Sequence, residues 1–95
     1  MHETGIVRDL VHRLERAASE AGAQRVCGVE VWLGALSQFS AAHFRAHFDD
    51  EARGTAAQGA ALRIVVSGDI EHPRAQSVVI QSVDLEVPDQ EHDFS

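Results

Sequence analysis

Cysteine is almost absent from this sequence: Cys27 is the single one in 95 residues. One thiol excludes an intrachain disulfide and a zinc site built from cysteines. No apolar run reaches the roughly 18 residues of a membrane span, and no secretory hydrophobic region is present. The formal net charge of −7 also lacks the basic excess that neutralises phosphates in a nucleic-acid binder. We therefore predict a cytoplasmic protein with no membrane insertion and no nucleic-acid partner.

Signatures of catalysis are missing as well. No nucleophile is paired with a base, no glycine-rich phosphate loop is present, and no pair of acids follows a strand. We therefore predict that the protein is not an enzyme. The length suffices for one sheet and a layer of helices. We predict a single domain over residues 1–88, followed by an acidic, frayed tail at 89–95.

Residues 5–21 have the pattern of an amphipathic helix. Thr4 is placed to cap its start, and Gly22 to end it in the left-handed conformation. Asp9 and Arg13 lie one turn apart as a favourable ion pair. Apolar side chains recur at helical spacing along one stripe: Ile6, Val7, Leu10, Val11, Leu14, Ala17, Ala18 and Ala21.

Residues 24–33 predict a strand with one face in the core. Alternation places Cys27, Val29, Val31 and Leu33 on the core face, and Val26, Gly28, Glu30 and Trp32 on the other. Two helices cover only one face of a small sheet, so Trp32 is expected on the open face. There Trp32, Val26 and Glu30 could form a contact surface for a partner, or Trp32 could be a partly shielded side chain. Cys27 is expected to be an inert small hydrophobic residue.

Residues 40–53 predict a second helix, with Ser40 as its N-cap. Phe39 and Phe44 have the spacing of a hydrophobic staple, which fixes the angle at which a chain enters a helix. Phe44 and Phe48 lie one turn apart and are expected to anchor the helix in the core.

The same helix carries His43 and His47, which share a face one turn apart. Such a pair can bind a metal ion, as in zinc-binding helices, or can stand solvated. No third ligand or general base is placed by the sequence, so both interpretations remain open.

Two further strands are predicted at residues 61–67 and 76–87. In the last strand, alternation separates Val79, Val83, Leu85 and Val87 from Val78, Ile80 and Ser82. Apolar residues on both faces of its first half predict that this strand is central. The order of the elements predicts that it runs antiparallel to the other two. The first two strands run parallel through a right-handed helical crossover. The order α-β-α-β-β then predicts an α+β, two-layer sandwich, with a three-stranded mixed sheet and two helices on one face.

The first three residues, Met1-His2-Glu3, form a ready-made metal chelate. The terminal amine, the His2 backbone nitrogen and the His2 ring Nδ1 close fused rings on one ion. The Glu3 backbone nitrogen can supply a fourth donor in the same plane. Four nitrogens in a plane suit Ni(II) or Cu(II) rather than tetrahedral Zn(II). The general order of affinities for divalent metals favours Cu(II) over Ni(II), so which metal binds would depend on which metal is supplied to the protein.

Three blocks of sequence occur in a characteristic order. Met1-His2-Glu3 precedes an amphipathic helix, and Leu33-Gly34-Ala35-Leu36-Ser37 follows an apolar strand. The third block runs from Phe48-Asp49 through Arg53-Gly54-Thr55 to Gly59-Ala60-Ala61-Leu62-Arg63-Ile64. Together they resemble the HypA/HybF family, the nickel-insertion accessory proteins of nickel-iron hydrogenases. Residues 77–87 look like the last strand of that family.

The resemblance implies a nickel metallochaperone that hands Ni(II) to the hydrogenase large subunit, working with the nickel-handling GTPase HypB. Some family members also serve urease. Carried onto this sequence, the ligands are Met1 through its amine, His2 through its ring and backbone nitrogens, and Glu3 through its backbone nitrogen. Family members often have an acidic residue near the metal at the start of the second helix, where this chain has Ser40.

Family members also carry a zinc-binding module with paired cysteines between the last two strands. Here that connection is the short, cysteine-free stretch 67–75, so no structural zinc is expected. The chain is therefore interpreted either as a trimmed nickel chaperone or as a non-catalytic assembly or structural protein associated with hydrogenase. The second role would use the open sheet face around Trp32, in a homodimer or as a docked subunit, with metal binding vestigial.

Overall fold

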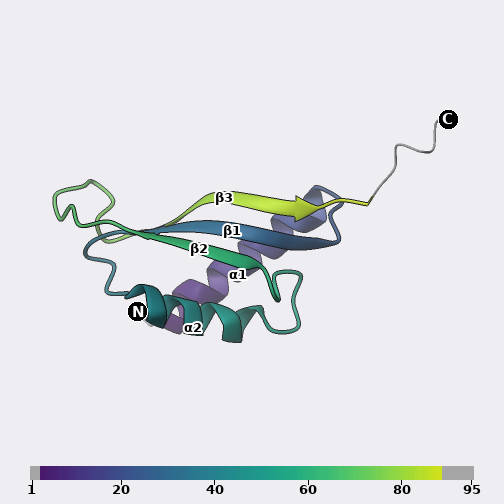
Figure 1. Ribbon diagram of the computed structural model, residues 1–95, viewed down its shortest axis with the longest axis horizontal. Helices are drawn as coiled ribbons and strands as arrows, with labels where there is room; N and C mark the ends of the chain where they lie inside the picture. Colours follow the sequence, from purple (N-terminus) through teal and green to yellow (C-terminus); the bar gives the residue numbers. More distant parts are fainter. Residues whose placement is uncertain (1–2, 89–95) are drawn as a thin grey trace.

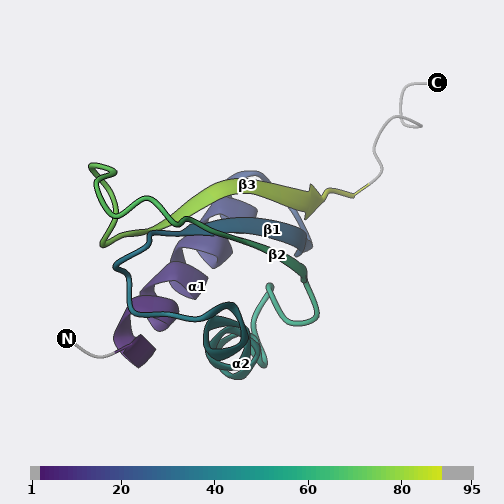
Figure 2. The ribbon, with the colours of Figure 1, turned by 60° about the vertical axis from the view of Figure 1, so that its left-hand side comes forward.

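The computed structural model of the protein describes residues 3–88. Its elements are α1 (Glu3–Glu20), β1 (Arg25–Leu33), α2 (Ala41–Ala52), β2 (Ala61–Val66) and β3 (Val78–Glu86). The strands form one mixed sheet, and both helices cover the same face of it (Figures 1 and 2). The expected α+β, two-layer architecture is confirmed. Neither helix of the described chain is long and apolar enough to cross a membrane.

Helix α1 lies with its apolar stripe against the sheet. Its fully or almost fully buried residues are Val7, Leu10, Val11, Leu14 and Ala18. Gly22 ends the helix with a φ of +68°, and the Ala23 amide donates to the Ala18 carbonyl at 2.8 Å, as expected for a left-handed C-terminus. Two expectations were wrong. The helix begins at Glu3, so Thr4 lies inside it rather than capping it, and Ala21 is exposed in the turn that follows.

Helix α2 is held at its start in the expected way. The Ser40 hydroxyl accepts a hydrogen bond from the His43 backbone N–H at 3.0 Å. Phe39 meets Phe44 edge to face, with ring centroids 5.3 Å apart, which confirms the hydrophobic staple. Phe44 and Phe48 are fully buried and anchor the helix in the core.

The sheet order is β2-β1-β3, so β1 is the central strand. The expectation that the last strand lies in the middle was wrong. β1 pairs in parallel with β2 and antiparallel with β3, and Val29 lies opposite both Leu62 and Val83. The central position explains why Val29, Val31 and Leu33 of β1 are completely buried.

A bulge in β1 moves two side chains away from their expected faces. The pairing with β3 shifts between Val26 and Gly28, which leaves Cys27 as the extra residue. Val26 is therefore buried in the core together with Val29, although alternation placed it on the open face. Cys27, expected in the core, is only half-buried. A β-bulge resets the period-two alternation, which a sequence pattern alone does not reveal.

A second irregularity, in β3, changes which of its side chains face the core. The pairing with β1 shifts between Glu30 and Val31, with Gln81 as the extra residue of β3. The shift corrects the expected faces, because the β3 side chains packed on the core are Val78, Ile80, Val83 and Leu85. Val79 instead lies opposite Trp32 on the open face.

Candidate metal centre

Of the predicted nickel ligands, Met1 and His2 lie outside the described residues. Glu3 is the first residue of α1. The N–H groups in the first turn of a helix have no acceptor within the helix. The Glu3 backbone nitrogen is therefore not needed for helical hydrogen bonding, and its use as a metal donor would leave α1 intact.

The fold gathers several segments at one end of the molecule. The starts of α1 and α2 lie there, together with the C-terminal ends of β1 and β2 and the β2–β3 connection (residues 67–77) (Figures 1 and 2). The two helices pack against each other, and an ion pair joins Arg8 Nε to Glu51 Oε1 at 3.3 Å. The start of α1 at Glu3 lies at the end of the molecule where α2 also begins.

Ser40 occupies the position where the resemblance would place an acidic side chain near the metal. Its hydroxyl caps α2 by accepting the His43 N–H. The residue therefore has a structural task, and a hydroxyl brings no negative charge to this end of α2. An axial carboxylate from this position is excluded.

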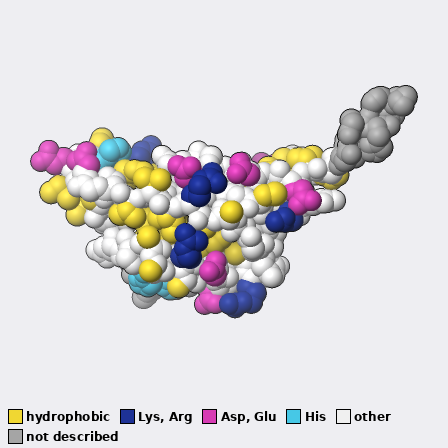
Figure 3. Space-filling view, viewed as in Figure 1, with side chains coloured by type: hydrophobic (Ala, Val, Ile, Leu, Met, Phe, Trp, Pro, Cys, Tyr) yellow, Lys and Arg dark blue, Asp and Glu magenta, His cyan; other side chains and the backbone are white. Residues whose placement is uncertain are grey.

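His43 and His47 do converge, one turn apart on α2. Their Nε2 atoms are 3.0 Å apart and their ring centroids 4.6 Å apart. Histidine side chains reach the surface at the start of α2 (Figure 3). Among the side chains that the structure describes, at residues 5–88, no group of three or more His, Cys, Asp or Glu is arranged to hold a metal ion.

The residues predicted to contact a partner are only partly brought together. Trp32 and Glu30 lie on the open face of β1, where Glu30 Oε1 accepts from Arg63 Nε of β2 at 3.4 Å. Val26 is buried in the core and is excluded from that surface. His72 is not among the predicted contact residues, yet its ring packs against Trp32 with centroids 4.8 Å apart. No signal in the sequence could have placed His72 there, because the contact depends on the path of the β2–β3 connection.

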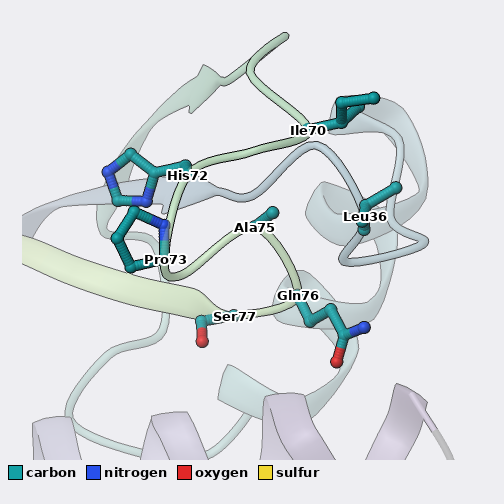
Figure 4. Close-up of a pocket in the computed structure, with 7 residues that line it drawn as sticks. All are labelled: Leu36, Ile70, His72, Pro73, Ala75, Gln76 and Ser77. Carbon is teal, nitrogen blue, oxygen red and sulfur yellow. The ribbon is translucent and has the colours of Figure 1, made fainter.

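The β2–β3 connection also borders a shallow hollow of about 310 Å³. In Figure 4, Leu36 and Ile70 lie on one side of it and His72 and Pro73 on the other. Leu36 and Ile70 are respectively 46% and 64% exposed, and hydrophobic side chains gather on the surface at this end of the molecule (Figure 3).

Comparison with known proteins places these features in a family. The family model described as hydrogenase/urease nickel incorporation, metallochaperone, hypA, matches residues 1–72. The hydrogenase maturation factor HybF of Salmonella typhimurium is 38% identical over 64 residues, which cover 67% of this chain and 57% of HybF. The hydrogenase maturation factor HypA of Geotalea daltonii is 39% identical over 64 residues, 67% of this chain and 56% of that protein.

A solved structure agrees with the fold. The solution structure of the Ni metallochaperone HypA from Helicobacter pylori matches with a TM-score of 0.77 and 16% sequence identity, covering 93% of this chain and 100% of that chain. At this identity the likeness bears on the fold alone. The chain spans little more than half the length of the curated relatives it matches. With the family model matched over residues 1–72, this chain belongs to the HypA family.

Proposed function

We propose that this protein is a nickel metallochaperone that binds Ni(II) at Met1-His2-Glu3 and helps deliver it during maturation of nickel-iron hydrogenase. The observation that carries the proposal is the family match, which begins at residue 1 and so includes this tripeptide. Nickel is the cargo in this role. The protein's own contribution is to hold the ion and release it, so no catalytic residue is assigned.

The chemistry of the tripeptide supports this choice of cargo. The Met1 amine, the His2 ring and backbone nitrogens and the Glu3 backbone nitrogen would form a flat ring of four donors. That geometry suits Ni(II) and differs from the tetrahedral sites of zinc. The start of α1 at Glu3 would limit the freedom of the residues attached to it and keep the ion beside the folded body.

The partners follow from the same role. The hydrogenase large subunit would receive the ion, and a nickel-handling GTPase would act with this protein in the cytoplasm. Residues 1–88 would act as one nickel-binding domain. The 67–77 connection contains no cysteine, so it offers no thiolate to a structural zinc ion.

Titration of tag-free protein with Ni(II) tests the proposal. A flat set of four nitrogens gives low-spin Ni(II) with a yellow absorption band, and His2→Ala is expected to abolish that band. His12→Ala is the matched control, because His12 is exposed on the solvent side of α1. Equal band intensity in the wild-type and His2→Ala proteins would refute binding at the tripeptide. A tag that blocks the amine is expected to act like His2→Ala.

The open sheet face supports a second candidate, an assembly or structural protein associated with hydrogenase. Trp32 is only half-buried there, and Val65 beside it on β2 is 43% exposed. If this face binds a second copy or a hydrogenase subunit, Trp32→Ala should disturb oligomerisation or capture of the subunit while metal binding is unchanged. An unaltered elution volume together with unaltered subunit capture would count against this role.

A further inference from the structure

The open face of the sheet is ordered in rows that cross all three strands. The strand register places Val65 of β2, Trp32 of β1 and Val79 of β3 side by side in one row. Val65 is 43% exposed, Trp32 and Val79 are half-buried, and the His72 ring lies against Trp32. Because both helices lie on the opposite face of the sheet, this row is an apolar strip that neither helix covers (Figure 2).

The rows farther from the β2–β3 connection carry charged side chains, most of which are paired. In the row beside the apolar strip, Arg63 Nε donates to Glu30 Oε1 at 3.4 Å. At the far end of the sheet, Arg25 Nη1 donates to Glu86 Oε1 at 3.1 Å. Both arginines of the three strands are thus matched by a carboxylate.

Asp84 is the exception among these charges. It lies opposite Gly28, in the row between the two ion pairs. Its Oδ2 atom is 2.9 Å from the point that a Cβ on Gly28 would occupy, so the carboxylate lies over a part of β1 that has no side chain. Asp84 is exposed, and within the described part of the chain it makes no hydrogen bond or ion pair. The open face therefore combines an apolar strip with one unpaired carboxylate.

The spacing of these two features matches that of side chains on a helix. Trp32 and Gly28 lie four positions apart on β1, which corresponds to about 13 Å along a strand. Side chains eight residues apart on one side of an α-helix span about 12 Å. A helix that lies along β1 with an apolar side chain on the strip would therefore bring a basic side chain, eight residues away, to Asp84. Covering the second face of a sheet with a helix is a common arrangement in α/β domains.

We propose that the open sheet face binds an amphipathic, basic helix of a partner protein. The row of Val65, Trp32 and Val79 is its apolar contact, and Asp84 accepts a hydrogen bond from its lysine or arginine. The proposal rests on the second role given above, because it names the kind of partner for the open face, and it does not depend on nickel binding. A partner's cation is required because covering Asp84 without one would bury an unpaired charge.

A second copy of this chain does not match this surface. Each copy has a formal net charge of −7 and would bring a further unpaired Asp84. We therefore expect the protein to be a monomer in sedimentation velocity. A dimer that Trp32→Ala dissociates would overturn the proposal, because a second copy would then occupy the open face.

Synthetic helical peptides without tryptophan test the proposal directly. Alanine-rich peptides of about 15 residues are long enough to form a helix in water. The first peptide carries leucines and, eight residues away on the same side, lysines. The second has glutamate in place of lysine, and the third has glutamine in place of leucine. Trp32 is the single tryptophan of the chain, so its emission reports contact with the open face. The first peptide should change that emission at a lower concentration than the other two.

Variants of Asp84 separate this contact from general attraction to an acidic protein. D84N should weaken binding of the lysine peptide about two- to fivefold, the effect of one exposed ion pair. D84K should make the protein prefer the glutamate peptide. D49K is the matched control, because it changes the net charge equally at an exposed site on α2. It should keep the preference for lysine.

Reversed preference in D49K as well as in D84K would overturn the proposal, since binding would then follow net charge. Unchanged binding in both D84N and D84K would also overturn it. Thermal unfolding checks that each variant retains the fold, and D84N decides the question if D84K does not.

The peptide experiments use no nickel, so their outcome is independent of the chelate. If wild-type and His2→Ala proteins give equal nickel bands while D84K reverses the peptide preference, the chelate fails and the docking surface stands. If the peptides bind as expected but Trp32→Ala leaves capture of the hydrogenase subunit unchanged, the surface stands and hydrogenase is not its partner.

Discussion

The two faces of β1 are covered by different kinds of contact. On one face, α1 and α2 bury Val29, Val31 and Leu33 completely. On the other, Trp32 keeps partial exposure beneath His72 of the β2–β3 connection. The helix-covered face is thus buried in a continuous apolar core. On the open face, Trp32 is instead covered by the His72 ring of the β2–β3 connection.

The β2–β3 connection is fixed to the strand ends mainly through backbone hydrogen bonds. Gly34 N–H donates to the Ser77 carbonyl at 2.9 Å, and Leu36 N–H to the Ala75 carbonyl at 2.7 Å. Each such bond contributes about 0.5–1.5 kcal/mol net, whereas burying one large apolar side chain contributes about 1.5–3 kcal/mol. The free energy of unfolding should therefore depend mainly on the side chains buried on the helix-covered face. The contacts of the open face can change with a smaller effect on stability.

The largest expected effect is on the helix-covered face. Phe44→Ala removes a completely buried ring and leaves a cavity, which should lower the free energy of unfolding by about 3–5 kcal/mol. Urea unfolding followed by circular dichroism measures this. Asp49→Ala, an exposed change on the same helix, is the control and should have little effect. Similar losses in the two variants would contradict the assignment of stability to the helix-covered face.

An intermediate effect is expected where the β2–β3 connection meets β1. A Cβ added at Gly34 would overlap the Ala75 carbonyl and lie 2.6 Å from the Arg74 carbonyl oxygen. Gly34→Ala should therefore displace the connection and lower the free energy of unfolding by about 1–3 kcal/mol. Faster hydrogen exchange of the Leu36 amide should accompany the loss of stability.

Gly68 provides the matched control for this substitution, because a Cβ there would meet nothing within 4 Å. Gly68→Ala should leave both the unfolding midpoint and the exchange of the Leu36 amide unchanged. If Gly34→Ala is equally neutral, the connection does not approach the strand as closely as described.

The smallest effect on stability is expected on the open face itself. His72→Gln removes the ring packed on Trp32, at a cost below about 1 kcal/mol because the imidazole is exposed. Trp32 is the single tryptophan of the chain, so its fluorescence should report the change directly. His12→Gln should leave the emission spectrum unaltered. An unchanged spectrum in His72→Gln would mean that the two rings are not in contact.

Local patterns in the sequence were sufficient for the helices and for much of the core. The stripe from Val7 to Leu14 predicted α1, and Ser40, Phe39 and Phe44 predicted how α2 begins. Such features depend on residues within a few positions of each other, which is why spacing reveals them. The strand order and the faces of Val26 and Val79 were not predictable, because pairing across strands and bulges are decided between distant segments.

For the proposed site, the sequence by itself is enough to predict the donors: an amine, an imidazole and backbone nitrogens at Met1-His2-Glu3, and two histidines one turn apart. Those sets are local, since a chelate or a helical pair needs only neighbouring residues. Only the tertiary structure decided that α1 and α2 begin at the same end, that Val26 is buried, and that His72 lies on Trp32 (Figure 1). Each of these depends on how the sheet and its connections fold together, which brings residues far apart in the chain into contact.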